Sequence, residues 1–402
     1  MAEPLSERRK SRVSLGTIVF TLWAAVVAVI FIRTILKPGS QTVFPVFYTA
    51  GGRWLRAENL YSGGNDYLYS PLIAAFFAPL SLVPTSLANL AWRTLNIAMY
   101  LGAAGLWLRH GINQIPKARH AIVFLIMLPL SIGSLNNAQS NPLLIALVLI
   151  ALAMAHAERW TLAALCIGLV TFLKVYPLAA GLVLAALFPR KFAWRLAVLL
   201  LALGALSLVL QRTGYVLEQY HNWAATRVAD ERHGDLTNSP RDFHMLLRVF
   251  GVVMEMKYYL VVQLLAGAAV AAVCFAGQLN GWAKDRLFTA LLTLVTCWML
   301  LFGPATESST YILLAPVIAL ATVEAFGRPF PRWMRALVAA ALFLLIGGGA
   351  FIAFGGHHKD IYSQSVQQFG TVIFCAFALA WIFQPSLWRD PQPSGSGVRI
   401  SP

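Results

Sequence analysis

Three short polar runs interrupt an otherwise apolar chain, and their side chains are of types that bind or process polar substrates. They are residues 136–141 (NNAQSN), Lys174 with Tyr176, and residues 306–309 (TESS), which include Glu307. Asn and Ser are ordinary turn formers, and a lysine can snorkel to a membrane interface, so each run alone also fits a structural role. An ionisable group at membrane depth costs about 2.5 to 3.5 kcal/mol, however, which makes Lys174 and Glu307 candidate functional residues.

A fourth region, residues 41–84, suits a lipid-linked substrate. Its tyrosines, tryptophan and arginines fit a membrane interface, and its leucines and phenylalanines fit acyl chains. The region follows one apolar run and ends in a proline-bounded apolar hairpin at residues 70–84. We expect residues 41–85 to form an external juxtamembrane or re-entrant segment that positions such a substrate.

The composition predicts a membrane protein with many spanning helices. The 402 residues are 58% hydrophobic and only 12% charged, and the mean hydropathy is +0.68. Soluble globular proteins carry about 25% charged residues, so that class is excluded. Apolar runs near the roughly 20 residues of a spanning helix recur from Leu15 to Gln384, which predicts one transmembrane domain over residues 1–384. The first run is too long for the apolar core of a signal peptide, about 7 to 15 residues, and is expected to remain as an anchor.

The positive-inside rule orients these segments. Basic residues 8–12 place the amino terminus in the cytoplasm, and the hairpin 70–84 is treated as re-entrant because a crossing there would put Arg109, Lys117 and Arg119 outside. Twelve crossings then leave both termini in the cytoplasm: residues 15–36, 87–108, 120–136, 142–157, 160–173, 175–189, 193–211, 258–279, 286–303, 308–326, 335–354 and 366–384. The predicted fold class is an all-α polytopic membrane protein.

Two features of this topology matter for function. A break near Lys174 and Pro177 divides residues 160–189 into two short helices, since one crossing would place Arg190 and Lys191 outside. The three polar runs and an external loop at residues 212–257 then share the outer face. The proline- and glycine-rich residues 385–402 are expected to be a disordered cytoplasmic tail.

Five segments resemble glycosyltransferase family 87, the polyprenyl-phosphate-mannose-dependent mannosyltransferases of bacterial membranes. They are FPVFYTAGGRWLRAENLY, YLYSPLIAAFFAPLSLVP, NNAQSNPLLIALVLIAL, FLKVYPLAAGLVL and NSPRDFHMLLRVFG, and the resemblance covers most of residues 41–320. It implies a GT-C-like fold in the bacterial inner membrane. It also implies transfer of a hexose, mannose in this family, from a polyprenyl-phosphate donor to a lipid or glycan acceptor at the extracytoplasmic face, with inversion and without a cofactor.

One position departs from the family pattern. Members usually carry an aspartate general base directly before the Phe-x-Val-Tyr-like run, and this chain has Val43 there. Positioned proton transfer contributes typically 10² to 10⁴-fold to such a reaction, so another carboxylate must act as the base or the chain is not catalytic. We rank Glu307 first, then Asp66 and Asp242, among the external carboxylates Glu58, Asp66, Glu218, Asp230, Glu231, Asp235, Asp242, Glu307 and Asp360. Capping of a helix is the structural alternative for Glu307.

The resemblance also assigns binding roles. A lipid phosphate requires cations, for which Lys174 and Arg248 are the best candidates because guanidinium and ammonium groups bind phosphate. Arg248 could equally face lipid headgroups, and Arg53, Arg56 and Arg93 are further candidates. The sugar or acceptor is expected to contact Asn137, Gln139, Asn141, Tyr69 and Tyr176; the first three lie in a Gly-Gln-x-Asn-like turn whose glycine is Ala138 here.

Other chemistry has less support in the sequence. The four cysteines lie in apolar segments without metal-ligand spacing, and His357, His358 and Asp360 are interpreted as a polar turn, so no metal is expected. The net charge of +15 indicates contact with anionic membrane lipids, and not with nucleic acid. Two alternatives to an active enzyme stay open: a degenerate relative that binds a lipid-linked sugar without transfer, which Val43 favours, and a polytopic transporter, for which inverted repeats would be expected.

Overall fold

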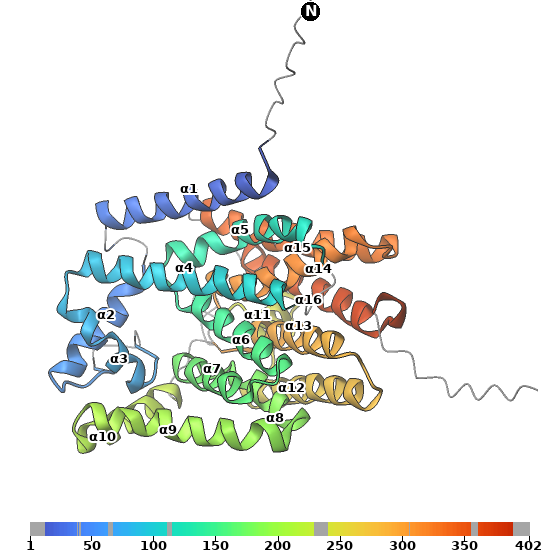
Figure 1. The fold of residues 1–402 in the computed structure, drawn as a ribbon. Coiled ribbons are helices and arrows are strands. Elements are labelled where there is room, and N and C mark those ends of the chain that lie inside the picture. Colours follow the sequence, from blue (N-terminus) through green and yellow to red (C-terminus); the bar gives the residue numbers. More distant parts are fainter. Residues whose placement is uncertain are drawn as a thin grey trace, which may run out of the picture.

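The computed structural model describes residues 13–37, 39, 42–62, 67–110, 115–228, 240–304, 306–354 and 361–388. Within these ranges the chain is helical and contains no strand (Figure 1). The α-helices are α1 (Leu15–Leu36), α2 (Phe44–Leu55), α3 (Pro71–Phe77), α4 (Thr85–Arg109), α5 (His120–Asn136), α6 (Asn141–His156), α7 (Trp160–Leu173), α8 (Leu178–Leu187), α9 (Trp194–Leu210), α10 (Thr213–Val228), α11 (Phe243–Val249), α12 (Met256–Leu279), α13 (Lys284–Phe302), α14 (Ala315–Gly327), α15 (Arg332–Phe354) and α16 (Ile361–Phe383). Shorter turns are η1 (Pro79–Leu82), η2 (Lys117–Arg119), η3 (Pro189–Ala193), η4 (Ser308–Leu314) and η5 (Pro385–Leu387).

The prediction of an all-α membrane fold is confirmed. Each predicted span coincides to within about five residues with one helix or, for residues 308–326, with η4 and α14 together. Eight helical segments of the described chain are long and apolar enough to cross a membrane. Three others, α6, α7 and α8, are apolar but shorter. α4, with 25 residues, is long enough to cross a membrane, but it is not one of the eight apolar helices. It carries the buried polar side chains Asn89, Arg93 and Asn96.

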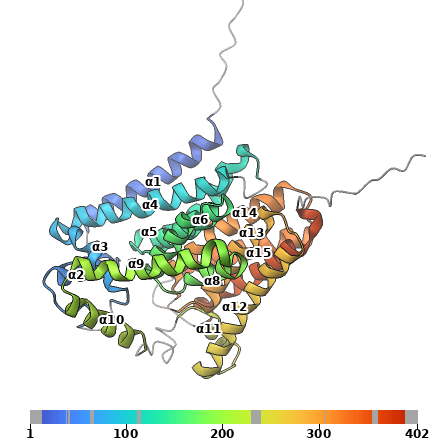
Figure 2. The same ribbon diagram turned by 60° about the horizontal axis from the view of Figure 1, so that its bottom comes forward.

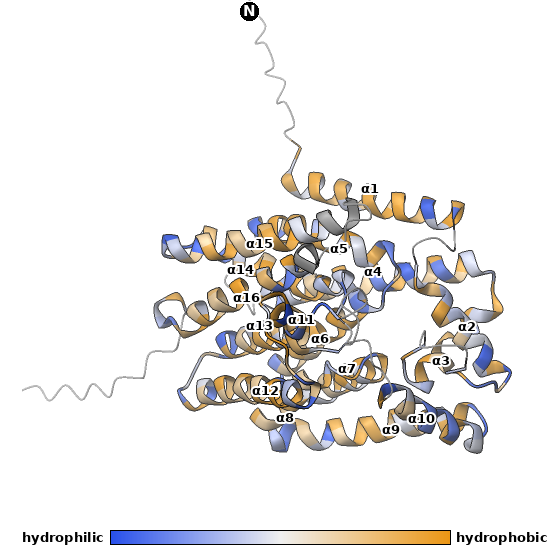
Figure 3. Ribbon diagram, turned by 180° about the vertical axis from the view of Figure 1, so that it is seen from behind, coloured by the Kyte–Doolittle hydropathy of each residue, from blue (hydrophilic) through white to orange (hydrophobic). Residues whose placement is uncertain are grey.

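The long helices differ in how deeply they are buried. In the most apolar windows of α13 and of η4 with α14, 83% and 89% of the residues are buried, against 17%, 17% and 11% in α1, η3 with α9, and α12. Phe20 of α1, Val209 of α9 and Leu264 of α12 are exposed, and Figure 3 shows hydrophobic residues over most of α1 and α12. Helices that expose an apolar surface over this length match a lipid environment.

The predicted break between α7 and α8 is confirmed. α7 ends at Leu173, Lys174 has extended backbone angles, and α8 begins at Leu178. The two helices fold back on one another, because the rings of Trp160 and Phe188, at their far ends, lie 4.9 Å apart. Lys174 therefore lies at the turn of a helical hairpin.

Short helices gather at one end of the bundle. α2, α3 and α10 lie beside one another in Figures 1 and 2, and α3 also packs against α9. α3 has seven residues, which at 1.5 Å per residue is about 10 Å and too short to cross a bilayer. The rings of Phe47 in α2 and Phe77 in α3 stack at 4.8 Å. A Cβ atom on Gly51 would lie 2.5 Å from the Phe77 carbonyl oxygen, so this contact requires glycine.

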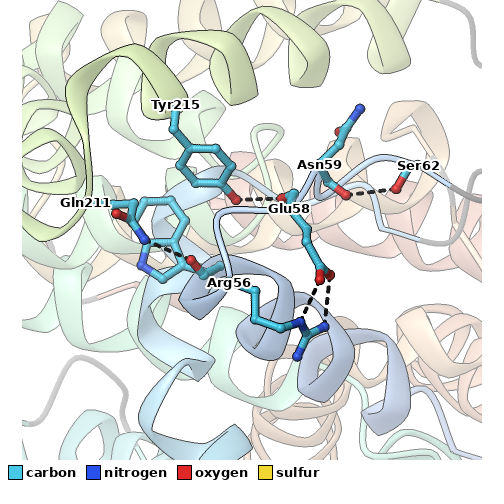
Figure 4. A network of polar contacts seen from close by, with 7 residues as sticks. Arg56, Glu58, Asn59, Ser62, Gln211 and Tyr215 are labelled. Carbon is cyan, nitrogen blue, oxygen red and sulfur yellow. Dashed lines mark hydrogen bonds and ion pairs between the residues drawn. The ribbon is translucent and has the colours of Figure 1, made fainter.

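The segment predicted as an external loop at residues 212–257 contains the helices α10 and α11. α10 packs against the chain after α2 (Figure 4). The Tyr215 hydroxyl donates to the Glu58 carbonyl at 2.7 Å, and the Gln211 side chain donates to the Trp54 carbonyl at 2.9 Å. The Leu60 amide donates to the buried Gln219 side chain at 2.9 Å. These hydrogen bonds to main-chain groups hold α10 in place, and the apolar periodicity of the sequence alone does not indicate this helix.

Packed structure also continues past the predicted start of the tail at residue 385. Leu387 and Trp388 are buried, the Trp388 ring stacks on Trp381 at 5.2 Å, and Arg328 donates to the Leu387 carbonyl at 2.5 Å. The predicted boundary is therefore too early, because two large apolar side chains pack there. Residues 389–402 lie outside the described part.

Candidate active site

The turn between α5 and α6 is held by three buried side chains of α4. The Trp92 indole donates to the Ala138 carbonyl at 2.9 Å, and the Arg93 guanidinium donates to the carbonyls of Leu135 and Asn136, the latter at 3.0 Å. The Asn96 side chain accepts the Leu143 amide at 3.2 Å. Main-chain groups that a helix leaves unpaired at its ends require such partners when buried. α4 therefore fixes the turn that presents Gln139 and Asn141.

Val43 lies against this same turn. Its amide donates to the Asn137 carbonyl at 3.0 Å, and its side chain packs with the apolar cluster that contains Phe44 and Ala138. Asn137 was predicted to bind sugar, and its main-chain carbonyl accepts a hydrogen bond from the residue directly before α2. The position of the usual family base is next to the Gln139 turn, and here it is apolar.

Glu307 lies directly before η4, with an exposed side chain. Its carboxylate accepts hydrogen bonds from the Gln139 side chain at 3.1 Å, from the Ser309 hydroxyl at 3.3 Å and from the Thr310 amide. The Thr310 hydroxyl in turn accepts the Glu307 amide at 3.0 Å, which completes a capping box. Glu307 therefore does cap a helix, as the structural alternative predicted. The same bonds hold an exposed carboxylate in one place beside the Gln139 turn.

Lys174 joins this site from the α7–α8 hairpin. Its ammonium group donates to the Asn141 side-chain oxygen at 2.9 Å, and the Asn141 amide donates to the Ser309 carbonyl at 3.4 Å. Asn141 has no exposed surface. One network therefore connects Lys174, Asn141, Ser309, Glu307 and Gln139, which come from three separate polar runs of the sequence.

Tyr176 and Tyr69 extend the site toward α3. The Tyr176 hydroxyl is buried, has no hydrogen-bond partner in the described part of the chain, and lies close enough to Tyr69 and Glu307 to interact electrostatically. The Tyr69 ring packs on Phe47 at 4.6 Å. The two tyrosines thus line the region between the Glu307 network and the short helices α2 and α3.

Arg241 is a residue that the sequence analysis did not select. Its amide donates to the Thr306 carbonyl at 2.6 Å, and its carbonyl accepts the Tyr311 hydroxyl at 2.9 Å. These bonds place it on the segment that carries Glu307. Burial lowers the pKa of Arg241, while Tyr311 and Glu307 oppose that shift. The run NSPRDFH contains this arginine, but nothing in the run distinguishes it from Arg248 before the chain is folded.

The remaining predicted site residues are distributed differently. Asp242 has no exposed surface and caps α11 by accepting the Met245 amide at 3.0 Å. Because a general base must reach the proton that it removes, this geometry indicates a structural role. Arg248 lies in the last turn of α11, six residues from Asp242 and about 9 Å along the helix. Asp66 lies outside the described residues.

Among the other described carboxylates, Glu58 is less suited to act as a base because it is paired with Arg56. The hydrogen bond from Arg56, with N···O distances of 2.7 and 2.9 Å, lowers the pKa of Glu58. Glu218 is exposed on α10. Asp230, Glu231, Asp235 and Asp360 lie outside the described residues, as do His357 and His358. No group of three His, Cys, Asp or Glu side chains that could hold a metal occurs in the part of the chain that is described.

A cavity of about 220 Å³ lies far from this network. Arg119, Glu324 and Arg328 are among its lining residues, which belong to the start of α5 and the end of α14. The Glu307 network lies at the other ends of these helices. The Glu307 network is the candidate site because of its residue types and contacts, and not because a cavity lies there.

The comparison with known families agrees with this arrangement. The family model for glycosyltransferase family 87 matches residues 67–304, more than half of the chain. The match includes Tyr69, Gln139, Lys174 and Arg241, and it leaves Val43 and Glu307 outside. No curated protein matches the sequence. The family has the GT-C membrane fold, its members are glycosyltransferases, and the fold implies a lipid-linked sugar donor. From the extent of the match, the chain belongs to glycosyltransferase family 87.

Proposed function

We propose that the chain transfers mannose from a polyprenyl-phosphate donor to a lipid or glycan acceptor at the extracytoplasmic face, with Glu307 as the general base. Family membership implies a glycosyltransferase. The observation that carries the assignment of the base is the 3.1 Å hydrogen bond from Gln139 to Glu307. It joins an exposed carboxylate to the polar turn that the family pattern contains.

The reaction requires one proton transfer and one displacement. The Glu307 carboxylate takes the proton of the acceptor hydroxyl as its oxygen attacks the anomeric carbon. The bond between that carbon and the phosphate oxygen breaks, its electron pair stays on the oxygen, and polyprenyl phosphate leaves. Attack from the opposite face inverts the anomeric carbon.

The neighbouring residues suit the other requirements of this step. The Gln139 amide suits a sugar hydroxyl, while the buried Asn141 positions Lys174 through its side-chain oxygen. Tyr176 has a buried hydroxyl without a described partner. Lys174 supplies positive charge for the phosphate, held by its bond to Asn141. Fixed donors and charges of this kind stabilise a transition state more than mobile ones, because they do not reorganise during the reaction.

The first experiment measures transfer directly. The purified protein, reconstituted in lipid, is incubated with radiolabelled polyprenyl-phosphate-mannose and a membrane lipid extract. We expect label in a new lipid or glycan product. Glu307→Gln keeps the shape of the side chain and an oxygen that accepts from Gln139, but it cannot take the proton. We expect it to reduce the rate about 10² to 10⁴-fold.

Glu218→Gln is the matched control, since it removes an exposed carboxylate from α10 outside the Glu307 network, and it should keep the native rate. Full activity of Glu307→Gln with a native fold would overturn the assignment of the base. Val43→Asp then tests whether the usual family position can act instead, and a rate that recovers in the double variant would show that it can.

Val43 favours one alternative function. A relative without the usual aspartate can bind the lipid-linked sugar without transferring it. Tight binding of the donor, with no product under any acceptor mixture, would support that function. Movement of intact donor across a vesicle membrane, without transfer, would support a transporter instead.

A further inference from the structure

Arg241 is fixed to the segment that carries Glu307 by its main chain alone. Its amide bonds to Thr306 at 2.6 Å and its carbonyl to the Tyr311 hydroxyl at 2.9 Å. Both bonds use backbone atoms, so the side chain is not required for them. The guanidinium is therefore not needed for these bonds, and it lies close enough to Glu307 to interact with it electrostatically.

The side chain itself has an unused donor. The Nη1 group of Arg241 is buried and has no hydrogen-bond partner among the described residues, and the described ion pairs do not include Arg241. A guanidinium carries five N–H donors. A buried donor without a partner is destabilising, so an anionic ligand explains this arginine better than a contribution to stability does.

A second cation is linked to the same segment. Lys174 bonds to Asn141, and Asn141 bonds to the Ser309 carbonyl. Arg241 is bonded through its main-chain amide to Thr306, and Lys174 is linked through Asn141 to Ser309, so both residues are tied to the short segment that carries Glu307. A group with negative charge that binds both would place its attached atoms beside the carboxylate.

We propose that Arg241, together with Lys174, binds the phosphate of the polyprenyl-phosphate donor and of the polyprenyl-phosphate product. This inference rests on the proposed function and replaces Arg248 as the arginine of the site. A planar guanidinium fork binds two phosphate oxygens at once. The phosphate gains negative charge as its bond to the sugar breaks, so Arg241 also stabilises the leaving group.

The test measures binding of polyprenyl phosphate without sugar, so it does not depend on transfer. Native protein and variants in nanodiscs are titrated with polyprenyl phosphate, with the uncharged polyprenol for comparison. We expect Arg241→Gln to weaken binding of the phosphate about tenfold to a hundredfold and to leave binding of polyprenol unchanged. Arg241→Lys keeps the positive charge but loses the planar guanidinium, so its affinity for polyprenyl phosphate should lie between those of the native protein and Arg241→Gln.

Arg212→Gln is the matched control, since it removes an exposed arginine at the same end of the bundle. Native affinity in Arg241→Gln, or weakened binding in Arg248→Gln alone, would overturn the inference while leaving the proposed transfer intact. A native protein that neither binds polyprenyl phosphate nor transfers mannose would overturn both.

A second measurement uses the native chain and so does not depend on the folding of any variant. An arginine-specific dicarbonyl reagent is applied with and without polyprenyl phosphate, and modification is mapped by mass spectrometry. We expect the lipid to protect Arg241 and not Arg212. Equal modification of Arg241 in both samples would contradict a phosphate contact.

Discussion

At the scale of single residues, Ala138 shows how backbone conformation positions the site. Its φ of 51° lies in the left-handed region, which costs an L-residue roughly 1 to 2 kcal/mol and which glycine adopts freely. The turn that results directs the Ala138 carbonyl to Trp92 and the Gln139 side chain to Glu307. The glycine of the family pattern at this position therefore has a conformational reason.

Replacement of Ala138 by valine tests this explanation. A β-branched residue is strongly disfavoured at positive φ, and its extra methyl groups do not fit a buried position. We expect Ala138→Val to lower the thermal midpoint of the reconstituted protein and to reduce transfer, because Gln139 loses its place. Ala138→Gly is the control and should keep both. A valine variant with the native midpoint and rate would contradict this role of the turn.

Residue type in the sequence was sufficient to select part of the candidate site. Glu307, Gln139, Asn141 and Lys174 are polar in apolar surroundings, and the structure connects them by hydrogen bonds. Arg241 was not identified, because its role depends on contacts with Thr306 and Tyr311, which are distant in the sequence. The burial of Asp242 likewise follows from tertiary packing and leaves no signal in the residues around it.

At the scale of elements, the apolar helices were predictable and the helices of mixed polarity, α10 and α11, were not. Apolar runs of about 20 residues specify a spanning helix by composition, and the break at Lys174 follows from charge placement. α10 has mixed polarity, and it is stabilised by contacts such as the bond between Gln219 and the Leu60 amide. α11 depends on the Asp242 cap. Such elements are specified by partners elsewhere in the chain, so periodicity does not reveal them.

The cap formed by α2, α3, α10 and the chain between α2 and α3 contains buried tyrosines whose ionisation opposes folding. Burial raises the pKa of Tyr61 and of Tyr67, and the Tyr67 hydroxyl donates to the Ser70 carbonyl at 2.9 Å. Because the folded pKa is raised, the stability is fully present below the unfolded value of about 10 and is lost as the pH rises above it. We therefore expect the cap to open in alkaline solution.

Tyrosinate absorbance and proteolysis of the reconstituted protein, followed together above about pH 10, check this expectation. Tyr67→Phe should move the opening to higher pH, since one of the opposing ionisations is removed. Tyr258→Phe removes an exposed tyrosine of α12 and is the control. Cleavage of the cap that does not change with pH, while the tyrosines ionise, would show that the phenols do not stabilise it.

At the scale of the whole molecule, the two ends of the bundle differ in chemistry. The Glu307 network and the short helices occupy one end. At the other end, Glu158 pairs with Lys284 at 2.5 Å and with Lys191 at 3.7 Å, which brings three loops together. The basic residues at this end were predicted to lie in the cytoplasm. In the structure, Lys191 and Lys284, which come from separate loops, lie beside the same Glu158 carboxylate. The positive-inside rule then predicts that the site end faces outward.

Labelling of introduced cysteines tests that orientation. Glu218→Cys marks the site end, and Lys284→Cys marks the basic end at the loss of one exposed ion pair, which contributes little to stability. The native cysteines are buried or half-buried, so the native protein provides the background. A membrane-impermeant thiol reagent applied to intact spheroplasts should label residue 218, and residue 284 only after lysis. The reverse result would place Glu307 on the cytoplasmic side of the membrane, and the proposed donor would then have to bind on that side. Labelling of both positions in intact cells would contradict a bundle whose two ends lie on opposite faces of the membrane.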